Sequence, residues 1–139
     1  MSVNRVALQG WGITVLRVMV GVVFVAHGTQ KLFSYGLSGV AGMFGQLGIP
    51  LPWLFAPIVS FVEFLGGLCL LMGLFTQYAA ALLAVNMLVA VLAVHAKAGF
   101  FLPKGAEYAL TLLAANISLV LSGPGCASLG ACVGGRKCS

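Results

Sequence analysis

The chain has 139 residues, room for one domain, and 61% of them are hydrophobic while only 6% are charged. Ordinary soluble domains have about 25% charged residues. Seven basic and two acidic side chains could not cover the surface of a soluble globule, so a soluble enzyme and a disordered protein are both excluded. The net charge of +5 does not indicate nucleic-acid binding, because the basic residues are scattered and form no run with interleaved aromatics. We therefore expect an integral membrane protein in contact with lipid, with no nucleic-acid partner.

Four apolar runs are candidates for crossing a hydrocarbon core of about 30 Å. They cover residues 11–33, 53–75, 78–96 and 107–122. None alternates with a period of two, which favours helices over a barrel. The first run is too long for the apolar core of a signal peptide, and we expect it to be retained. The sequence predicts an all-α integral membrane four-helix bundle, one membrane domain over residues 1–139, ending in a polar Cys- and Gly-rich tail at 123–139.

The connections between the runs carry further signals. In the segment 34–52, four apolar residues follow the helical spacing i, i+3, i+4, i+7: Val40, Met43, Phe44 and Leu47. This spacing predicts a short amphipathic helix over 38–47 that lies in the membrane interface. The second and third runs are separated only by Thr76 and Gln77, so we expect these two helices to be antiparallel neighbours.

An even number of spans places both chain ends on one face of the membrane, here named side A, and the opposite face is side B. Basic residues do not distinguish the two faces, because three lie on each: Arg5, Arg136 and Lys137 on side A, and Lys31, Lys97 and Lys104 on side B. Arg17, nearer side A, favours cytoplasmic termini. We predict a multi-pass protein of a bacterial-type cytoplasmic (inner) membrane.

Ionisable groups inside a span are costly and each needs an explanation. Arg17 lies about 9 Å from side A and Glu63 about 18 Å from it, counting 1.5 Å per helical residue. Glycines on both helices would allow close approach, so Arg17 is predicted to reach Glu63 and form a buried pair. Two interpretations remain open. The pair either fixes helix register or makes Glu63 the buried acid of a redox or proton site.

Two histidines near side B raise the question of a haem. His27 and His95 lie on the first and third runs, at depths that would suit bis-His ligation. However, His95 is about 180° from Asn86 around a regular helix, so both cannot face the bundle axis. We do not expect haem. Hydrogen bonding, proton transfer and a simple interfacial role remain open for these histidines.

Helix 107–122 begins at side B with a carboxylate and a phenol, Glu107 and Tyr108. The carboxylate could relay protons, or it could only complement the helix dipole. His27 and Lys31 share a face of the first span with Arg17. We therefore predict a pocket that opens toward side B between the first, second and fourth spans.

The four cysteines do not have metal-site spacing. Cys69 is predicted to be a small core residue. Cys126, Cys132 and Cys138 recur with five residues between neighbours, unlike the paired cysteines of zinc sites. We expect that the cysteines bind no metal and that their thiols are free. If side A lay outside the cytosol, one disulfide could form.

Several short motifs follow one another between about residues 16 and 129. They are Arg17 with Gly21, the stretches 27–33, 42–44, 47–50, 63–67, 73–76 and 99–100, Glu107-Tyr108, and Gly123-Pro124-Gly125. In this order they resemble the DoxX family of small four-span membrane proteins. The chain departs from the family pattern after the last of these, where Cys126 and Gly130 replace a basic and an acidic residue.

The resemblance implies membrane redox chemistry, since the family is associated with quinone-linked oxidation and with quinone and thiol-redox stress. The expected function is an oxidoreductase that interacts with quinone, or the membrane subunit of one. Related four-span proteins act as chaperones or assembly factors, which leaves open a non-enzymatic scaffold or anchor that recruits soluble redox enzymes. We also expect a homo-oligomer, formed through Gly and Asn faces such as that of Asn116.

Quinone binding requires an apolar slot with polar groups near the ring oxygens. The expected binding residues are Arg17, His27, Gln30, Lys31 and Tyr108, and the expected catalytic residues are Glu63, His27 and Glu107. The sequence has no flavin or dinucleotide motif. Electrons would therefore pass through a small bound cofactor or a partner subunit.

Overall fold

The computed structural model describes residues 2–135, which contain helices and no β-strand. The long helices are continuous with short π-helical or 3₁₀ turns, labelled η. In chain order the elements are α1 (Ser2–Thr29), η1 (Gln30–Tyr35), α2 (Gly36–Gln46), α3 (Pro52–Met72), α4 (Thr76–Ala90), η2 (Val91–His95), η3 (Ala96–Ala98), α5 (Glu107–Ser122) and α6 (Leu129–Val133).

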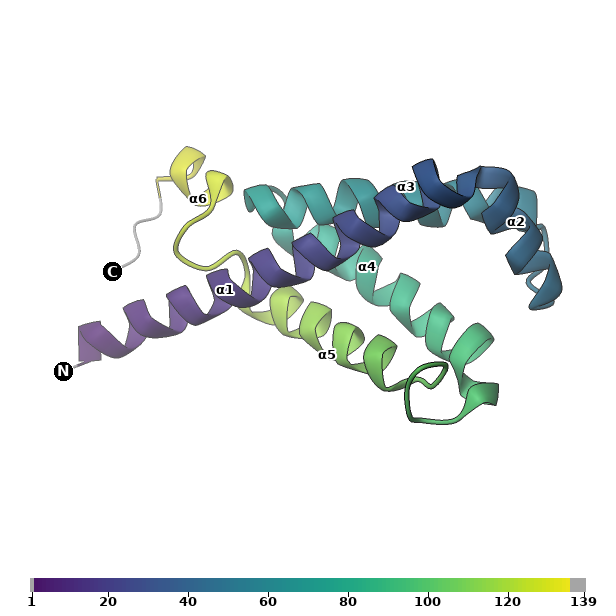
Figure 1. Ribbon diagram of the computed structural model, residues 1–139. Helices are drawn as coiled ribbons and strands as arrows, with labels where there is room; N and C mark the ends of the chain where they lie inside the picture. The colour runs from purple at the N-terminus through teal and green to yellow at the C-terminus, as the bar shows by residue number, and fades with distance from the viewer. Residues whose placement is uncertain (1, 136–139) are drawn as a thin grey trace.

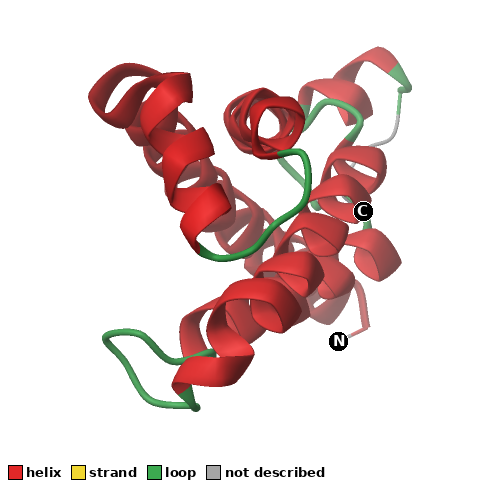
Figure 2. Cartoon of the chain, turned by 90° about the vertical axis from the view of Figure 1, so that its right-hand side faces the viewer, coloured by secondary structure: helices red, strands yellow, loops and turns green. Residues whose placement is uncertain are grey.

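The helices pack as two pairs, α1 with α3 and α4 with α5, and the contacts of α3 with α4 and of α1 with α5 join the pairs. The first turns of α1 and the short α6 lie at one end of the bundle, while α2 and the loop 99–106 lie at the other (Figure 1). Figure 2 looks at the bundle from the α2 end, where the helix pairs diverge. The two ends correspond to sides A and B of the sequence argument.

A glycine ends α3 earlier than the sequence predicts. Gly73 adopts φ +69, its N–H donates to the Leu70 carbonyl, and the Leu74 N–H donates to the Cys69 carbonyl. This is a Schellman motif, which needs a residue that tolerates the left-handed region. The connection to α4 is therefore 73–75 rather than Thr76-Gln77, but α3 and α4 are neighbours as predicted.

The amphipathic helix predicted at 38–47 is present as α2. Its residues Val40 and Phe44 pack against Ala56 of α3 in a small apolar cluster. Met43 and Leu47, which belong to the same predicted apolar face, are exposed and line a cavity. The position of α2 in a membrane interface remains a prediction.

The surface of the bundle is apolar and several polar groups are inside it. Among the described residues, Arg17, Glu63 and Asn116 are buried, whereas Leu121 and Phe101 are more than three-quarters exposed. This inverted distribution is expected where lipid is the solvent. Asn116 is fully buried and donates to the Leu112 carbonyl, and the homo-oligomer stays a prediction.

The all-α membrane bundle is confirmed, but four full-length spans are not. Three helical stretches of the described chain are long and apolar enough to cross a membrane: Arg5–Gln46, Pro52–Met72 and Thr76–Ala98. The fourth predicted span, Glu107–Ser122, is a helix with the predicted bounds. It has only 16 residues, fewer than the roughly 20 that a perpendicular span needs.

Candidate functional site

A cavity of about 790 Å³ opens between the two helix pairs at the side B end. All of the long helices contribute to its wall, together with α2 and the loop that follows it. The wall is largely apolar, and its polar groups are a few side chains on α1, η1, α3, α4, η2, η3 and α5. Cavities of this size and composition are typical of small-molecule sites.

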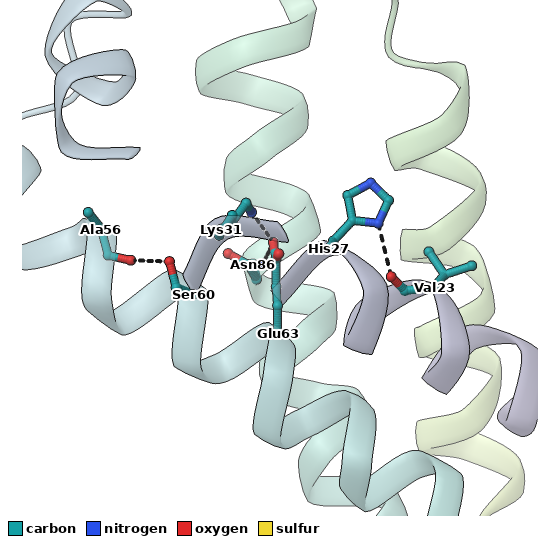
Figure 3. A network of polar contacts seen from close by, with 7 residues as sticks. All are labelled: Val23, His27, Lys31, Ala56, Ser60, Glu63 and Asn86. Atoms are coloured by element: carbon teal, nitrogen blue, oxygen red, sulfur yellow. Dashed lines mark hydrogen bonds and ion pairs between the residues drawn. The ribbon is translucent and has the colours of Figure 1, made fainter. Parts of the chain in front are cut away.

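The polar floor of the cavity is a three-residue network centred on Glu63 of α3 (Figure 3). Lys31 Nζ of η1 lies 2.6 Å from Glu63 Oε1, and Asn86 Nδ2 of α4 donates to the same oxygen at 2.8 Å. The Glu63 side chain is only 3% exposed and that of Lys31 is 17% exposed. The other carboxylate oxygen, Oε2, is buried and has no hydrogen-bond partner among the described residues.

Glycines set the register between α1 and α3. A Cβ added at Gly28 would lie 2.5 Å from the backbone nitrogen of Phe64, and one added at Gly21 would lie 3.0 Å from the Gly67 carbonyl oxygen. The two backbones therefore touch, as predicted from the small residues on both helices. This register places Lys31, beyond Gly28, next to Glu63.

The same register shows that the predicted Arg17–Glu63 pair is wrong. A Cβ added at Gly73 would collide with the Arg17 guanidinium, so Arg17 is level with Gly73. That is ten residues beyond Glu63 on α3, or about 15 Å along the helix. Depths counted from the ends of the apolar runs place the two groups closer, because α1 begins at Ser2, well before the first apolar run.

Arg17 instead holds the C-terminal segment against α1. Its Nη1 and Nη2 donate to the carbonyl oxygens of Pro124 and Ala127, at 2.6 and 2.5 Å. Thr14, one helical turn earlier, accepts from the backbone N–H of Cys126 at 3.0 Å. Arg17 is thus a buried structural residue at the side A end and does not line the cavity.

Both histidines line the cavity and are oriented by backbone carbonyls. His27 Nδ1 lies 2.9 Å from the Val23 carbonyl oxygen, and His95 Nδ1 lies 3.0 Å from that of Lys104. The His27 ring also faces the Tyr108 ring at a centroid distance of 6.0 Å. Because a carbonyl only accepts, Nδ1 carries the hydrogen in each ring, and in neutral imidazole Nε2 is an acceptor.

The expectation that Asn86 and His95 cannot face the same space is wrong, since both line the cavity. The physical reason is η2, a π-helical turn over Val91–His95. A π turn bonds residue i to i+5, so each residue advances by less than the 100° of an α-helix. The 180° separation holds only for a uniform α-helix over these nine residues, and the chain changes to a π turn after Ala90.

The structure brings together four of the predicted site residues and separates three. His27, Lys31, Glu63 and Tyr108 line the cavity, whereas Arg17, Gln30 and Glu107 do not. Gln30 donates to the Tyr35 hydroxyl. The Glu107 carboxylate accepts from the backbone N–H of Leu102 at 2.7 Å, in the loop before α5. It organises that loop and does not contribute to the cavity wall.

Sequence reasoning missed the contribution of the third apolar run. Asn86 bonds the central carboxylate directly, and the stretch from Met87 to Lys97 forms much of the wall. The predicted pocket between the first, second and fourth spans did not include it. The available signal was an amide inside an apolar run, at a depth similar to that of Glu63, about 12 Å against about 18 Å from side A.

The cysteines differ from expectation at one position. Cys69 and Cys132 are free thiols, as predicted. Cys126 is disulfide-bonded, so the prediction of a free thiol is wrong there. Cys138 lies outside the described residues. No group of three or more potential metal ligands occurs within the described part of the chain.

Comparisons with known proteins identify the family. The family model described as DoxX matches residues 12–96. The chain is 34% identical over 112 residues to "Putative oxidoreductase CatD" of Bacillus subtilis, covering 81% of this chain and 79% of that protein. It is 35% identical over 121 residues to "Uncharacterized membrane protein Rv3486" of Mycobacterium tuberculosis, covering 79% and 74%.

An uncharacterized protein of Haemophilus influenzae is 33% identical over 118 residues, covering 82% of this chain and 84% of its own length. No solved structure matches the chain. The family match includes the α1–α3 register glycines and the Lys31–Glu63–Asn86 network. With relatives matched over most of their lengths, this multi-pass membrane protein belongs to the DoxX family.

Proposed function

We propose that this protein binds a quinone-type ring in the cavity and works as a quinone-linked oxidoreductase, or as the membrane subunit of one, in a cytoplasmic membrane. The observation that carries the proposal is the buried Lys31–Glu63–Asn86 network at the floor of an otherwise apolar cavity. A charged group at this depth is costly, and such residues commonly mark functional sites. The description of the CatD relative as an oxidoreductase agrees in general class.

The cavity wall suits a lipid-soluble ring. Val89 and Leu92 line the cavity and are 52% and 65% exposed, so the wall is continuous with the apolar outer surface. An apolar tail could extend there into the bilayer while the ring rests against Phe24 and Met87. At the other end, His95 and Lys97 bring the cavity to the side B surface, where protons are available.

The polar residues fit the oxygens of such a ring. When bound, a quinone supplies two-electron, two-proton chemistry. The ammonium of Lys31 has three hydrogens and needs only one for Glu63, so it can donate to a ring oxygen. The Tyr108 hydroxyl can donate as well. Glu63 and the two histidine Nε2 atoms can accept protons.

Co-purification and titration test this proposal. Protein extracted with its native lipid should yield a ring lipid in the mass spectrum of an organic extract, and should bind added decylubiquinone in one of its two oxidation states. His27→Ala and Glu63→Gln should weaken binding at least tenfold. Glu107→Gln should bind as the wild type does, because its carboxylate is engaged by Leu102.

Gln77→Ala is the matched control, since this amide donates to the Val120 carbonyl far from the cavity. If only phospholipid is extracted and neither oxidation state of decylubiquinone binds, the proposal fails. That result would favour the scaffold or anchor role that recruits soluble redox enzymes.

A further inference from the structure

We propose that the cavity selects the dihydroxy form of the ring over the dione, an inference that rests on the proposed ring binding and names the form of the ligand. The two forms of the ring differ in their hydrogen-bond donors and acceptors. A dione oxygen only accepts, whereas a hydroxyl donates one hydrogen and still accepts. The form that fits is therefore set by which polar groups of the wall lack partners.

The first group that lacks a partner is the acid at the floor. Glu63 Oε1 accepts from both Lys31 and Asn86, while Oε2 is buried and has no donor within residues 2–135. A buried acceptor without a partner is destabilising, and a charged one more so. The terminal torsion of a glutamate is soft, so the carboxyl can turn and present either oxygen to the cavity without moving α3. A ligand hydroxyl would satisfy it, but a dione oxygen would place two acceptors together.

The histidines add two acceptors of the same kind. In His27 and His95 the Nδ1 hydrogen is committed to the carbonyls of Val23 and Lys104. In the neutral imidazole ring, Nε2 then has no hydrogen and can only accept. Both rings line the cavity, on opposite helix pairs, so a hydroxyl on the ring has an acceptor on either side.

The donors of the wall do not reverse this preference. Lys31 and Tyr108 can donate to a ring oxygen in either form, because a hydroxyl oxygen accepts as a carbonyl does. The dihydroxy ring satisfies donors and acceptors together, while the dione satisfies donors only. One charge-assisted hydrogen bond in a buried site corresponds to a difference of about 10- to 100-fold in affinity.

Three ligands with one ring separate the effects: duroquinol, duroquinone and the dimethyl ether of duroquinol. Their dissociation constants for the detergent-solubilised protein are measured anaerobically by titration calorimetry. We expect duroquinol to bind about 10- to 100-fold more tightly than duroquinone. We expect the ether to bind no better than the dione, because it has lost the hydrogens but kept the ring and its methyl groups.

Variants identify the residues that cause the preference for the dihydroxy form. Glu63→Gln replaces an acceptor oxygen with a donor and should bring the two affinities within threefold. His27→Ala should reduce the preference while leaving the melting temperature near that of the wild type, which keeps the test usable if Glu63→Gln unfolds. Cys132→Ser, an exposed thiol on α6, is the control and should keep the full preference.

Equal or tighter binding of duroquinone, or an ether that binds like duroquinol, would overturn the preference while leaving ring binding intact. An unchanged preference in the folded His27→Ala variant would overturn it as well. If none of the three ligands binds, and decylubiquinone does not bind either, the proposed function itself fails and the preference fails with it.

Discussion

Glu63 is the residue around which the cavity is built, and its two neighbours come from different helices. Lys31 reaches it from η1, which continues α1, and Asn86 from the C-terminal half of α4. Removing one charge of a buried ion pair leaves the other without compensation, which costs more than the pair itself contributes. The network therefore has a measurable signature in stability.

We predict that Glu63→Leu destabilises the protein by about 2–3 kcal/mol. This is somewhat less than the loss of about 3–5 kcal/mol for a fully buried pair, because the partly exposed Lys31 can extend toward side B. The double variant Lys31→Met with Glu63→Leu should recover at least half of this loss. The measurement is reversible unfolding in mixed micelles. A double variant less stable than Glu63→Leu alone would show that the pair does not couple as the structure indicates.

Arg17 supplies the matched control for this cycle. Because it binds the carbonyls of Pro124 and Ala127 and not Glu63, its variants should be additive with Glu63→Leu within about 0.5 kcal/mol. A coupling comparable to that of Lys31 would restore the pair predicted from the sequence.

For individual ionisable side chains, the sequence predicted which ones are buried but not which ones contact each other. Glu63 and Arg17 stand out because ionisable groups are rare in apolar runs. Their partners depend on the axial offset between α1 and α3. An error of two or three helical turns in that offset predicts Arg17, in place of Lys31, as the partner of Glu63. Composition does not contain that offset. It is set by where the glycine backbones touch.

The packing of α1 against α3 depends on glycines at the points where the two backbones touch. Gly28 has no space for a side chain, whereas an added Cβ at Gly12, on the same helix, would have no heavy atom of the described chain within 4 Å. Substitution by alanine should therefore have opposite effects on stability at the two positions, although each Gly→Ala change raises the intrinsic helix propensity by about 1 kcal/mol.

We predict that Gly28→Ala lowers the free energy of unfolding by about 1–3 kcal/mol through overpacking against Phe64. Gly12→Ala should leave it unchanged or raise it by up to about 1 kcal/mol. Denaturant unfolding in the same micelles measures both. If Gly28→Ala is as stable as Gly12→Ala, the close approach of the two helices at this level is wrong.

Helices were the most predictable level of the fold. The bounds of α5 and the existence of α2 follow from apolar spacing and from the residues that interrupt it. The π turns η1 and η2 were not predictable, because a π turn has no spacing of its own in a uniformly apolar run. Since η2 rotates His95 into the cavity wall, the missed turn also removed a site residue from the prediction.

Basic residues and a disulfide bear on the orientation of the bundle across the membrane. The basic residues divide evenly, and Arg17, which favoured cytoplasmic termini, is engaged with backbone carbonyls inside the protein. The disulfide at Cys126 is a different kind of indicator, because disulfides are rare in the cytosol. It favours side A outside the cytosol, against the sequence-based preference.

We therefore predict that Cys132, an exposed free thiol on α6, reacts with a membrane-impermeant maleimide in intact cells. Cys132→Ser should abolish this labelling, since Cys69 is half-buried within α3. Labelling that appears only after the membrane is permeabilised would show that the termini are cytoplasmic, as the sequence suggested.

The continuity of the cavity wall with the outer surface at Val89 and Leu92 has a consequence for affinity. A site entered from the side draws its ligand from the membrane phase, where an oily ring accumulates far above its level in water. If the proposed ring lipid binds there, its occupancy depends on its mole fraction in the lipid, and a weak affinity for the protein is enough to fill the site. Dilution into excess phospholipid should empty it, whereas dilution with buffer should not.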